Sequence, residues 1–102
     1  MPPIVNHACY INTEDANRYR SCGAWLDVTL YDYLTKNAAL YPQREALIEP
    51  PNKEDYQGVS PRRLNWCELL AAVNALSRLF QRLGVGHGDV VMVQLPNTWE
   101  SV

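Results

Sequence analysis

The sequence predicts an α/β fold whose sheet is incomplete within the 102 residues of the chain. The clearest observation is a helical pattern from Asn65 to Leu83, where apolar residues recur every three or four positions. The run VVMVQL at 90–95 is almost entirely apolar, which is typical of a strand covered on both faces of a parallel sheet. Short strands are also expected at 45–49 and 62–64, paired antiparallel as a hairpin. Helices and strands in this order indicate an α/β unit.

Two helices are expected before the hairpin. Thr13 can cap a short helix that ends at Gly23, because glycine accepts the left-handed conformation found after many helices. Thr29 can cap a second helix that runs to Tyr41, with Asp32 at its third helical position. The start of each helix is therefore marked by a side chain that can accept a hydrogen bond from a backbone N–H.

The long helix carries signals at both ends. Asn65 is a favourable N-cap residue, and Glu68 follows at the spacing of a capping box. Gly84 supplies the left-handed position that ends the helix. We therefore expect a long amphipathic helix that packs by one face. The apolar residues on that face are Leu69, Val73, Leu76, Phe80 and Leu83.

The remaining segments are predicted from their turn-forming and capping residues. The polar stretch 50–61 contains prolines and a glycine, so a surface loop is expected there. Pro96 ends the apolar strand, because proline has no amide with which to continue a ladder. Asn97 and Glu100 repeat the capping spacing, which predicts a further helix, and Val102 lies about one turn into it. We therefore expect the sequence to be a truncated part of a longer domain.

Composition narrows the class of protein. The chain is 47% hydrophobic and 20% charged, which is close to the averages of soluble globular proteins. Its net charge of −2 and scattered basic residues argue against a nucleic-acid partner. No apolar run approaches the roughly 18 residues of a transmembrane segment, and the N-terminus lacks a secretory signal. Three cysteines without a CxxC pair suit a reduced, cytoplasmic setting.

Three glycines near the end of the long helix have the spacing of a possible phosphate loop: Gly84, Gly86 and Gly88. A phosphate loop follows a strand and opens a helix, so that the amides at the helix N-terminus meet the phosphate. These glycines follow a helix and precede a strand, so they would meet the negative end of the helix dipole. We therefore expect a structural turn.

No side chain is assigned a catalytic, cofactor-binding or metal-binding role from its own chemistry. His87 could act as a base but is expected to be an exposed turn residue. His7 and Cys9 lack further ligands at metal-site spacing. Cys67 could be activated by a helix N-terminus, yet a cysteine beside an apolar stripe is commonly a packing residue, and Glu68 is better explained as a cap. Packing is also the expected role of the three tryptophans, Trp25, Trp66 and Trp99.

Three motifs resemble the N-terminal part of the adenylate-forming (AMP-dependent) synthetase and ligase superfamily. They are LNWCEL at 64–69, GVGHGDV at 84–90 and LPN at 95–97. Upstream, residues 29–48 are similar to the first helix and strand of that family, so the resemblance covers essentially 18–102. It implies a lead with a short helix at residues 1–28. It also implies that residues 29–102 begin the large N-terminal domain of such an enzyme, truncated.

The resemblance implies a two-step acid–thiol ligase. A small carboxylic acid and ATP, with Mg²⁺, would give an acyl-adenylate and pyrophosphate, and a thiol such as coenzyme A would then take the acyl group. The phosphate loop, the adenine- and ribose-binding motifs and the catalytic lysine of the family are absent from these residues. No site residue can therefore be transferred to a position here, and the chain alone is expected to be inactive.

The choice of substrate stays open between related enzymes. We favour an acyl-CoA synthetase, as in fatty-acid metabolism. The segment RYRSCGAW at 18–25 is also similar to the lead of aryl-acid AMP ligases, which load a carrier-protein thiol in siderophore synthesis. A third possibility, from another class, is a truncated chain without catalysis that offers its apolar surface to a partner.

Overall fold

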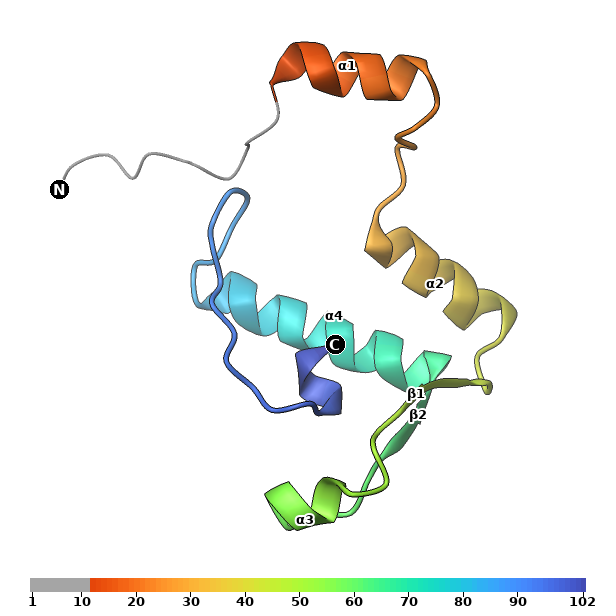
Figure 1. Cartoon of the computed structure of the whole chain (residues 1–102), viewed down its shortest axis with the longest axis vertical. Coiled ribbons are helices and arrows are strands. Elements are labelled where there is room, and N and C mark those ends of the chain that lie inside the picture. Colours follow the sequence, from red (N-terminus) through yellow and green to blue (C-terminus); the bar gives the residue numbers. More distant parts are fainter. Residues whose placement is uncertain (1–11) are drawn as a thin grey trace, which may run out of the picture.

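The computed structural model describes residues 12–102 (Figure 1). Helices and a single small sheet of two strands make up this part of the chain, which confirms the predicted mixture of helices and strands. In chain order, the elements are α1 (Thr13–Ser21), α2 (Leu30–Leu40), β1 (Glu45–Ile48), α3 (Lys53–Gln57), β2 (Arg63–Asn65), α4 (Trp66–Arg82) and the 3₁₀ helix η1 (Trp99–Ser101).

The predicted hairpin forms between β1 and β2. Its strands pair antiparallel, with Leu47 opposite Leu64 and Ile48 opposite Arg63, and a bulge follows Glu45. Leu64 is 4% exposed and is the one buried apolar side chain among the described residues. Strand β2 runs directly into α4, so the hairpin fixes where that helix begins.

Side-chain caps define the starts of α2 and α4, as predicted. The Asn65 side chain accepts the N–H of Glu68 at 2.8 Å, and the Glu68 carboxylate accepts the N–H of Asn65 at 2.9 Å. Thr29 and Asp32 form the same reciprocal pair at the start of α2. The backbone N–H and the hydroxyl of Thr29 both donate to Asp32 and hold the pKa of that carboxyl below its usual value. Gly84, at φ +84°, follows the end of α4.

Helices α2 and α4 pack against each other, whereas α1 stands apart from both (Figure 1). The hydroxyl of Tyr31 on α2 donates to the Asn74 side chain on α4 at 2.8 Å. The first helix begins one residue earlier than its predicted cap implies. Asn12 is the N-cap because its side-chain oxygen accepts the N–H of Asp15 at 2.7 Å, and Thr13 is the first helical residue.

The prediction of a loop at 50–61 is wrong in part, since α3 lies within it. The N–H of Lys53 donates to the carbonyl of Pro50, which starts the turn. Gly58, at φ +66°, ends it in the left-handed conformation. Proline before the helix and glycine after it are the usual limits of a short helix, so the same residues that indicate a loop also fit this one.

The predicted strand at 90–95 is not a strand in the structure but an extended segment. A strand requires a hydrogen-bonded neighbour, and none of the described residues provides one at this position. The helix expected from Asn97 is also shorter and later, because only the three residues of η1 are helical and Thr98 is the N-cap. The predicted strand and the predicted helix would both need contacts with residues that are distant in the sequence.

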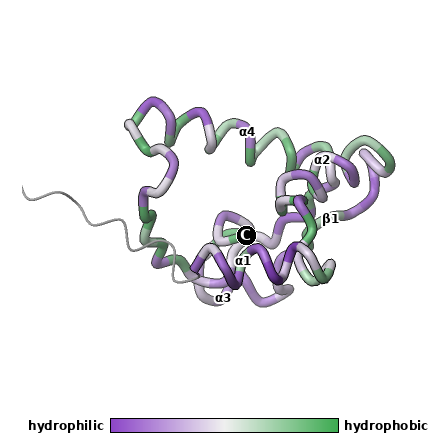
Figure 2. The backbone as a smooth tube through the Cα atoms, turned by 90° about the horizontal axis from the view of Figure 1, so that it is seen from above, coloured by the Kyte–Doolittle hydropathy of each residue, from purple (hydrophilic) through white to green (hydrophobic). Residues whose placement is uncertain are grey.

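The described part of the chain is open in shape. Its Cα radius of gyration is 17.6 Å, whereas a compact domain of 100 residues has a value of about 13 Å. Figure 2 shows hydrophobic positions along α4 and in the loops. None of the helices in residues 12–102 is both long and apolar enough to cross a bilayer.

Candidate functional site

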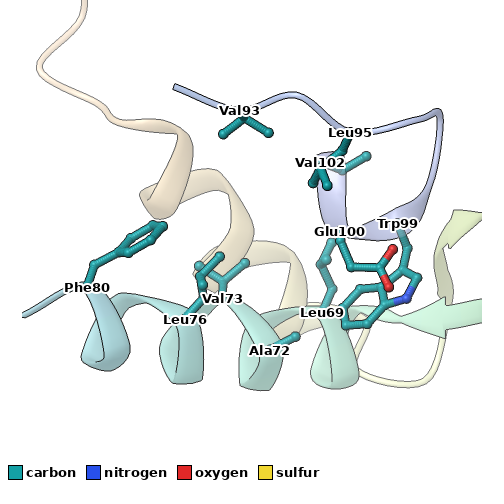
Figure 3. A pocket seen from close by; sticks show the side chains of 10 residues that line it. All are labelled: Leu69, Ala72, Val73, Leu76, Phe80, Val93, Leu95, Trp99, Glu100 and Val102. Carbon is teal, nitrogen blue, oxygen red and sulfur yellow. The ribbon is translucent and has the colours of Figure 1, made fainter. Parts of the chain in front are cut away.

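An apolar cavity of about 350 Å³ lies between α4 and the C-terminal segment (Figure 3). Helix α4 contributes one face of its apolar residues, because side chains three and four positions apart lie on the same side of a helix. The extended segment and η1 close the opposite side (Figure 3). The lining residues are Leu69, Ala72, Val73, Leu76, Phe80, Val93, Leu95, Trp99, Glu100 and Val102.

The chemistry of this cavity is that of an apolar binding or packing surface. Glu100 is its one ionisable lining residue among those described, and the other lining side chains are apolar or aromatic. Sites that bind phosphates or acids carry polar groups that converge on the ligand. The cavity is therefore suited to apolar side chains or apolar ligand groups.

The glycines after α4 form a hydrogen-bonded turn between α4 and the extended segment, as predicted. The N–H of Gly86 donates to the carboxylate of Asp89 at 2.6 Å, and the N–H of Asp89 donates to the carbonyl of Gly86. One amide is thus already used, and a negative carboxylate stands where a phosphate would approach. His87 is exposed in this turn, as expected, and lines the edge of a second, open pocket with Phe80 and Val102.

A buried polar cluster joins the hairpin to the C-terminal segment; we call Glu49, Lys53, Arg62 and Trp99 the Glu49 cluster. One carboxylate oxygen of Glu49 accepts from the Lys53 ammonium and from the N–H of Arg62, each at 2.7 Å. The other oxygen accepts the N–H of Trp99, also at 2.7 Å. The guanidinium of Arg62 lies 4.8 Å from the centre of the Trp99 ring.

The charge of Glu49 is stabilised in spite of its burial. Glu49 and Lys53 are 4% and 3% exposed. Burial by itself raises the pKa of the Glu49 carboxyl, but the hydrogen bonds from Lys53, Trp99 and Arg62, with the positive charge of Lys53, outweigh it and lower that pKa. The carboxylate is therefore ionised at neutral pH and fully satisfied by donors.

Sequence analysis missed this cluster, because it treated Glu49 as a strand end and Lys53 as part of a surface loop. The signal in the sequence is a pair of opposite charges four positions apart, although Glu49 precedes α3 and only Lys53 belongs to it. No sequence pattern connects either residue to Trp99, which is 50 positions from Glu49. The contact between Glu49 and Trp99 was therefore not predictable from local spacing.

Glu68 caps α4, as predicted, whereas Cys67 is exposed and is not the packing residue that the sequence indicated. Cys67 and Glu68 are exposed at the start of α4, and the N–H of Cys67 donates to the carbonyl of Pro42. The three tryptophans have separate surroundings: Trp25 lies against Tyr19, Trp66 begins α4, and Trp99 belongs to the Glu49 cluster. His7 and Cys9 fall outside the described residues. Across residues 12–102, no group of three potential metal ligands is found.

Comparison with known proteins identifies relatives over most of the chain. A 2,3-dihydroxybenzoate-AMP ligase specific for vibriobactin, from Vibrio cholerae, is 35% identical over 85 residues, which is 83% of this chain and 14% of that protein. The 2-hydroxy-7-methoxy-5-methyl-1-naphthoate–CoA ligase of Streptomyces carzinostaticus is 31% identical over 85% of this chain and 14% of its own length. An acetyl-coenzyme A synthetase of Coprinopsis cinerea is 31% identical over 71% of this chain and 10% of its own length.

The chain thus spans between 10% and 14% of the length of these three relatives. No solved structure matches it significantly. The family described as AMP-binding enzyme matches residues 34–102, from within α2 to the last residue. This match covers more than half of the chain and includes α4, the glycine turn and the Glu49 cluster. The chain belongs to the AMP-binding enzyme family of adenylate-forming ligases.

Proposed function

We propose that the chain is the N-terminal part of an ATP-dependent acid–thiol ligase that acts on an aromatic carboxylic acid. The observation that carries this proposal is the similarity to the Vibrio cholerae 2,3-dihydroxybenzoate-AMP ligase over 83% of the chain. The naphthoate–CoA ligase supports the same class of acid. Residues 1–28 would be a lead, and residues 29–102 would begin the large domain.

The proposed reaction has two balanced steps. A carboxylate oxygen of the acid attacks the α-phosphorus of ATP, and pyrophosphate leaves with its charge offset by Mg²⁺. The sulfur of a thiol then attacks the acyl carbon, and AMP leaves as a thioester forms. The thiol is that of coenzyme A or of a carrier protein, and we assign neither step to a residue of this chain.

A second candidate is an acyl-CoA synthetase for an aliphatic acid, which the similarity to the acetyl-coenzyme A synthetase supports. The two candidates differ in the acid pocket, which hydroxylated aromatic acids require to be polar and fatty acids require to be apolar. Either ligase would work in the cytoplasm. The thiols of Cys22 and Cys67, both free and exposed, support a reducing setting.

The first test uses the product of the native gene. Its intact mass is measured, and ATP–pyrophosphate exchange is then assayed with 2,3-dihydroxybenzoate, a hydroxynaphthoate and acetate. Exchange with the aromatic acids is expected. Exchange with acetate alone would replace the aromatic proposal by the aliphatic one. Thioester formation with coenzyme A or with a carrier protein is the second measurement, and it identifies the thiol.

A non-catalytic role of residues 1–102 alone is the rival from another class. A native product of this mass, with no exchange for any acid, would support it. Under the ligase proposal the separate chain is poorly folded, because one apolar side chain among the described residues is buried while many large ones are exposed. Residual helix with dye-binding apolar surface would support that view, and a single cooperative unfolding transition would count against it.

A further inference from the structure

The C-terminal segment of the chain is held by hydrogen bonds at each of its two ends. At one end, the N–H of Val85 donates to the carbonyl of Phe80 in α4, and the Gly86–Asp89 turn follows. At the other end, the N–H of Trp99 donates to the buried carboxylate of Glu49, and the hydroxyl of Tyr56 donates to the carbonyl of Asn97 at 3.0 Å. The residues between these points cross over α4 in extended form (Figures 1 and 3).

Between the two fixed points the backbone has no ladder of its own. Within the described chain, residues 90–95 take part in no backbone–backbone hydrogen bond. Their side chains do little to hold them, since Val90 is 86% exposed and Met92 is 91% exposed. Val93 and Leu95 line the cavity, which stays open to solvent on one side. The position of this segment therefore depends on its anchors.

From this geometry, we propose that Glu49 is the positioning residue that anchors residues 90–102 across α4. It is suited to this role because its carboxylate is buried, accepts three hydrogen bonds and draws its donors from three separate parts of the chain. Lys53 supplies the compensating charge from α3. Arg62 both donates its backbone N–H and covers the Trp99 ring with its guanidinium.

Each partner of Glu49 has a distinct share in the anchor. Lys53 and Arg62 are near in sequence and connect α3 to the start of β2, so they hold the carboxylate in place. Trp99 is the distant partner, and its N–H is the group that the carboxylate captures. A buried carboxylate with this many donors is held firmly, because loss of Lys53 would leave its charge unpaired and loss of either amide would leave it short of a hydrogen bond. The anchor is independent of any catalytic activity.

The test uses the ¹⁵N,¹³C-labelled product of the native gene and requires no substitution in its first arm. A scalar coupling across the hydrogen bond, from the Trp99 amide nitrogen to the Glu49 carboxyl carbon, is measured by NMR. Observation of this coupling supports the anchor. Its absence, or a Trp99 amide that exchanges with solvent as fast as in an unfolded peptide, overturns it.

The second arm compares Glu49→Ala with Glu54→Ala, which makes the same change at an exposed glutamate on α3, next to Lys53. In Glu49→Ala, we expect the Trp99 amide to exchange at least about tenfold faster, while the amide of Leu76 in α4 changes less than about twofold. Glu54→Ala should leave both unchanged. Equal exchange of the Trp99 amide in Glu49→Ala and the unsubstituted chain would overturn the proposal.

Discussion

The Glu49 cluster and the cavity face of α4 reverse the usual distribution of polar and apolar groups. In the first region, Glu49 and Lys53 are at most 4% exposed, and Thr98 next to Trp99 is equally buried. In the second, Leu76 on α4 is 46% exposed, and Val93, which lines the cavity from the extended segment, is 61% exposed. Charged side chains are seldom buried in proteins, and a contiguous exposed apolar surface is uncommon. The described residues therefore satisfy the buried charges of the Glu49 cluster but leave much of the apolar surface at α4 uncovered.

The difference lies in how many partners each kind of contact needs. A carboxylate is satisfied by a few donors, and the 53 residues from Glu49 to Ser101 supply all of those that Glu49 uses. An apolar helix face has to be covered by a comparable area of another surface, and stabilisation grows with the area covered. The extended segment covers only part of α4. Further surface, such as the rest of a ligase domain, is what our functional proposal would add.

The largest expected effect comes from the one buried apolar side chain. Leu64→Ala should destabilise the hairpin by about 2 kcal/mol or more, since it leaves a cavity between β1, β2 and α4. The measurement is hydrogen exchange of the Glu49 amide, which donates to the carbonyl of Arg62. Exchange should be about 30-fold faster. Leu83→Ala, at a side chain that is 70% exposed, is the control and should have little effect.

A smaller effect is expected at the cap of α4. Asn65→Ala removes the acceptor of the Glu68 N–H and should cost about 1 kcal/mol of helix stability. Asn65→Asp keeps an acceptor at this position and should cost much less. The Glu68 amide reports the change by hydrogen exchange. Equal exchange in the two variants would show that the cap is not used in solution.

The apolar face can be tested with a solvatochromic dye. Val93→Lys places a charge at the cavity and should lower the bound-dye fluorescence by about threefold, because the dye requires apolar surface. Met92→Lys is the matched control, since the neighbouring Met92 is not among the lining residues. If both substitutions lower the fluorescence equally, the dye binds the exposed segment and not the cavity.

The smallest expected effect is that of pH, which should leave the Glu49 cluster unchanged over a wide range. The pKa of Glu49 is lowered in the folded chain. Its stabilising contribution is therefore complete above the ordinary glutamate pKa of about 4.3, and it is lost as pH falls through the lower pKa of the folded state. Protection of the Trp99 amide, corrected for intrinsic exchange, should be constant from about pH 7 to about pH 5. A loss within that interval would contradict the ionised cluster.

The sequence predicted best those features that depend on neighbouring residues. The caps at Thr29 and Asn65 and the left-handed Gly84 each follow from residues within one helical turn of one another, and the structure has all three. The hairpin was also predicted, because two short strand-like segments flank a polar stretch with prolines and a glycine, which indicates a connection between them. Its α3 was missed, since prolines and a glycine mark loops and short helices alike.

Features that depend on distant residues were predicted less well. The run at 90–95 has the composition of a strand, but a ladder needs a partner strand that no local pattern supplies, and the described residues provide none. The Glu49 cluster was missed for a related reason, because its contact with Trp99 joins segments that no spacing rule connects.

The extended segment has one further consequence, which concerns the behaviour of the separate chain at high concentration. The hexapeptide VVMVQL is rich in β-branched residues, has no charge and no proline, and has backbone groups free of intrachain ladder bonds. Peptides of this kind stack into cross-β fibrils, because every copy offers the next a complete set of donors and acceptors. An edge that is harmless once a neighbouring strand covers it is thus a template for self-assembly when left open.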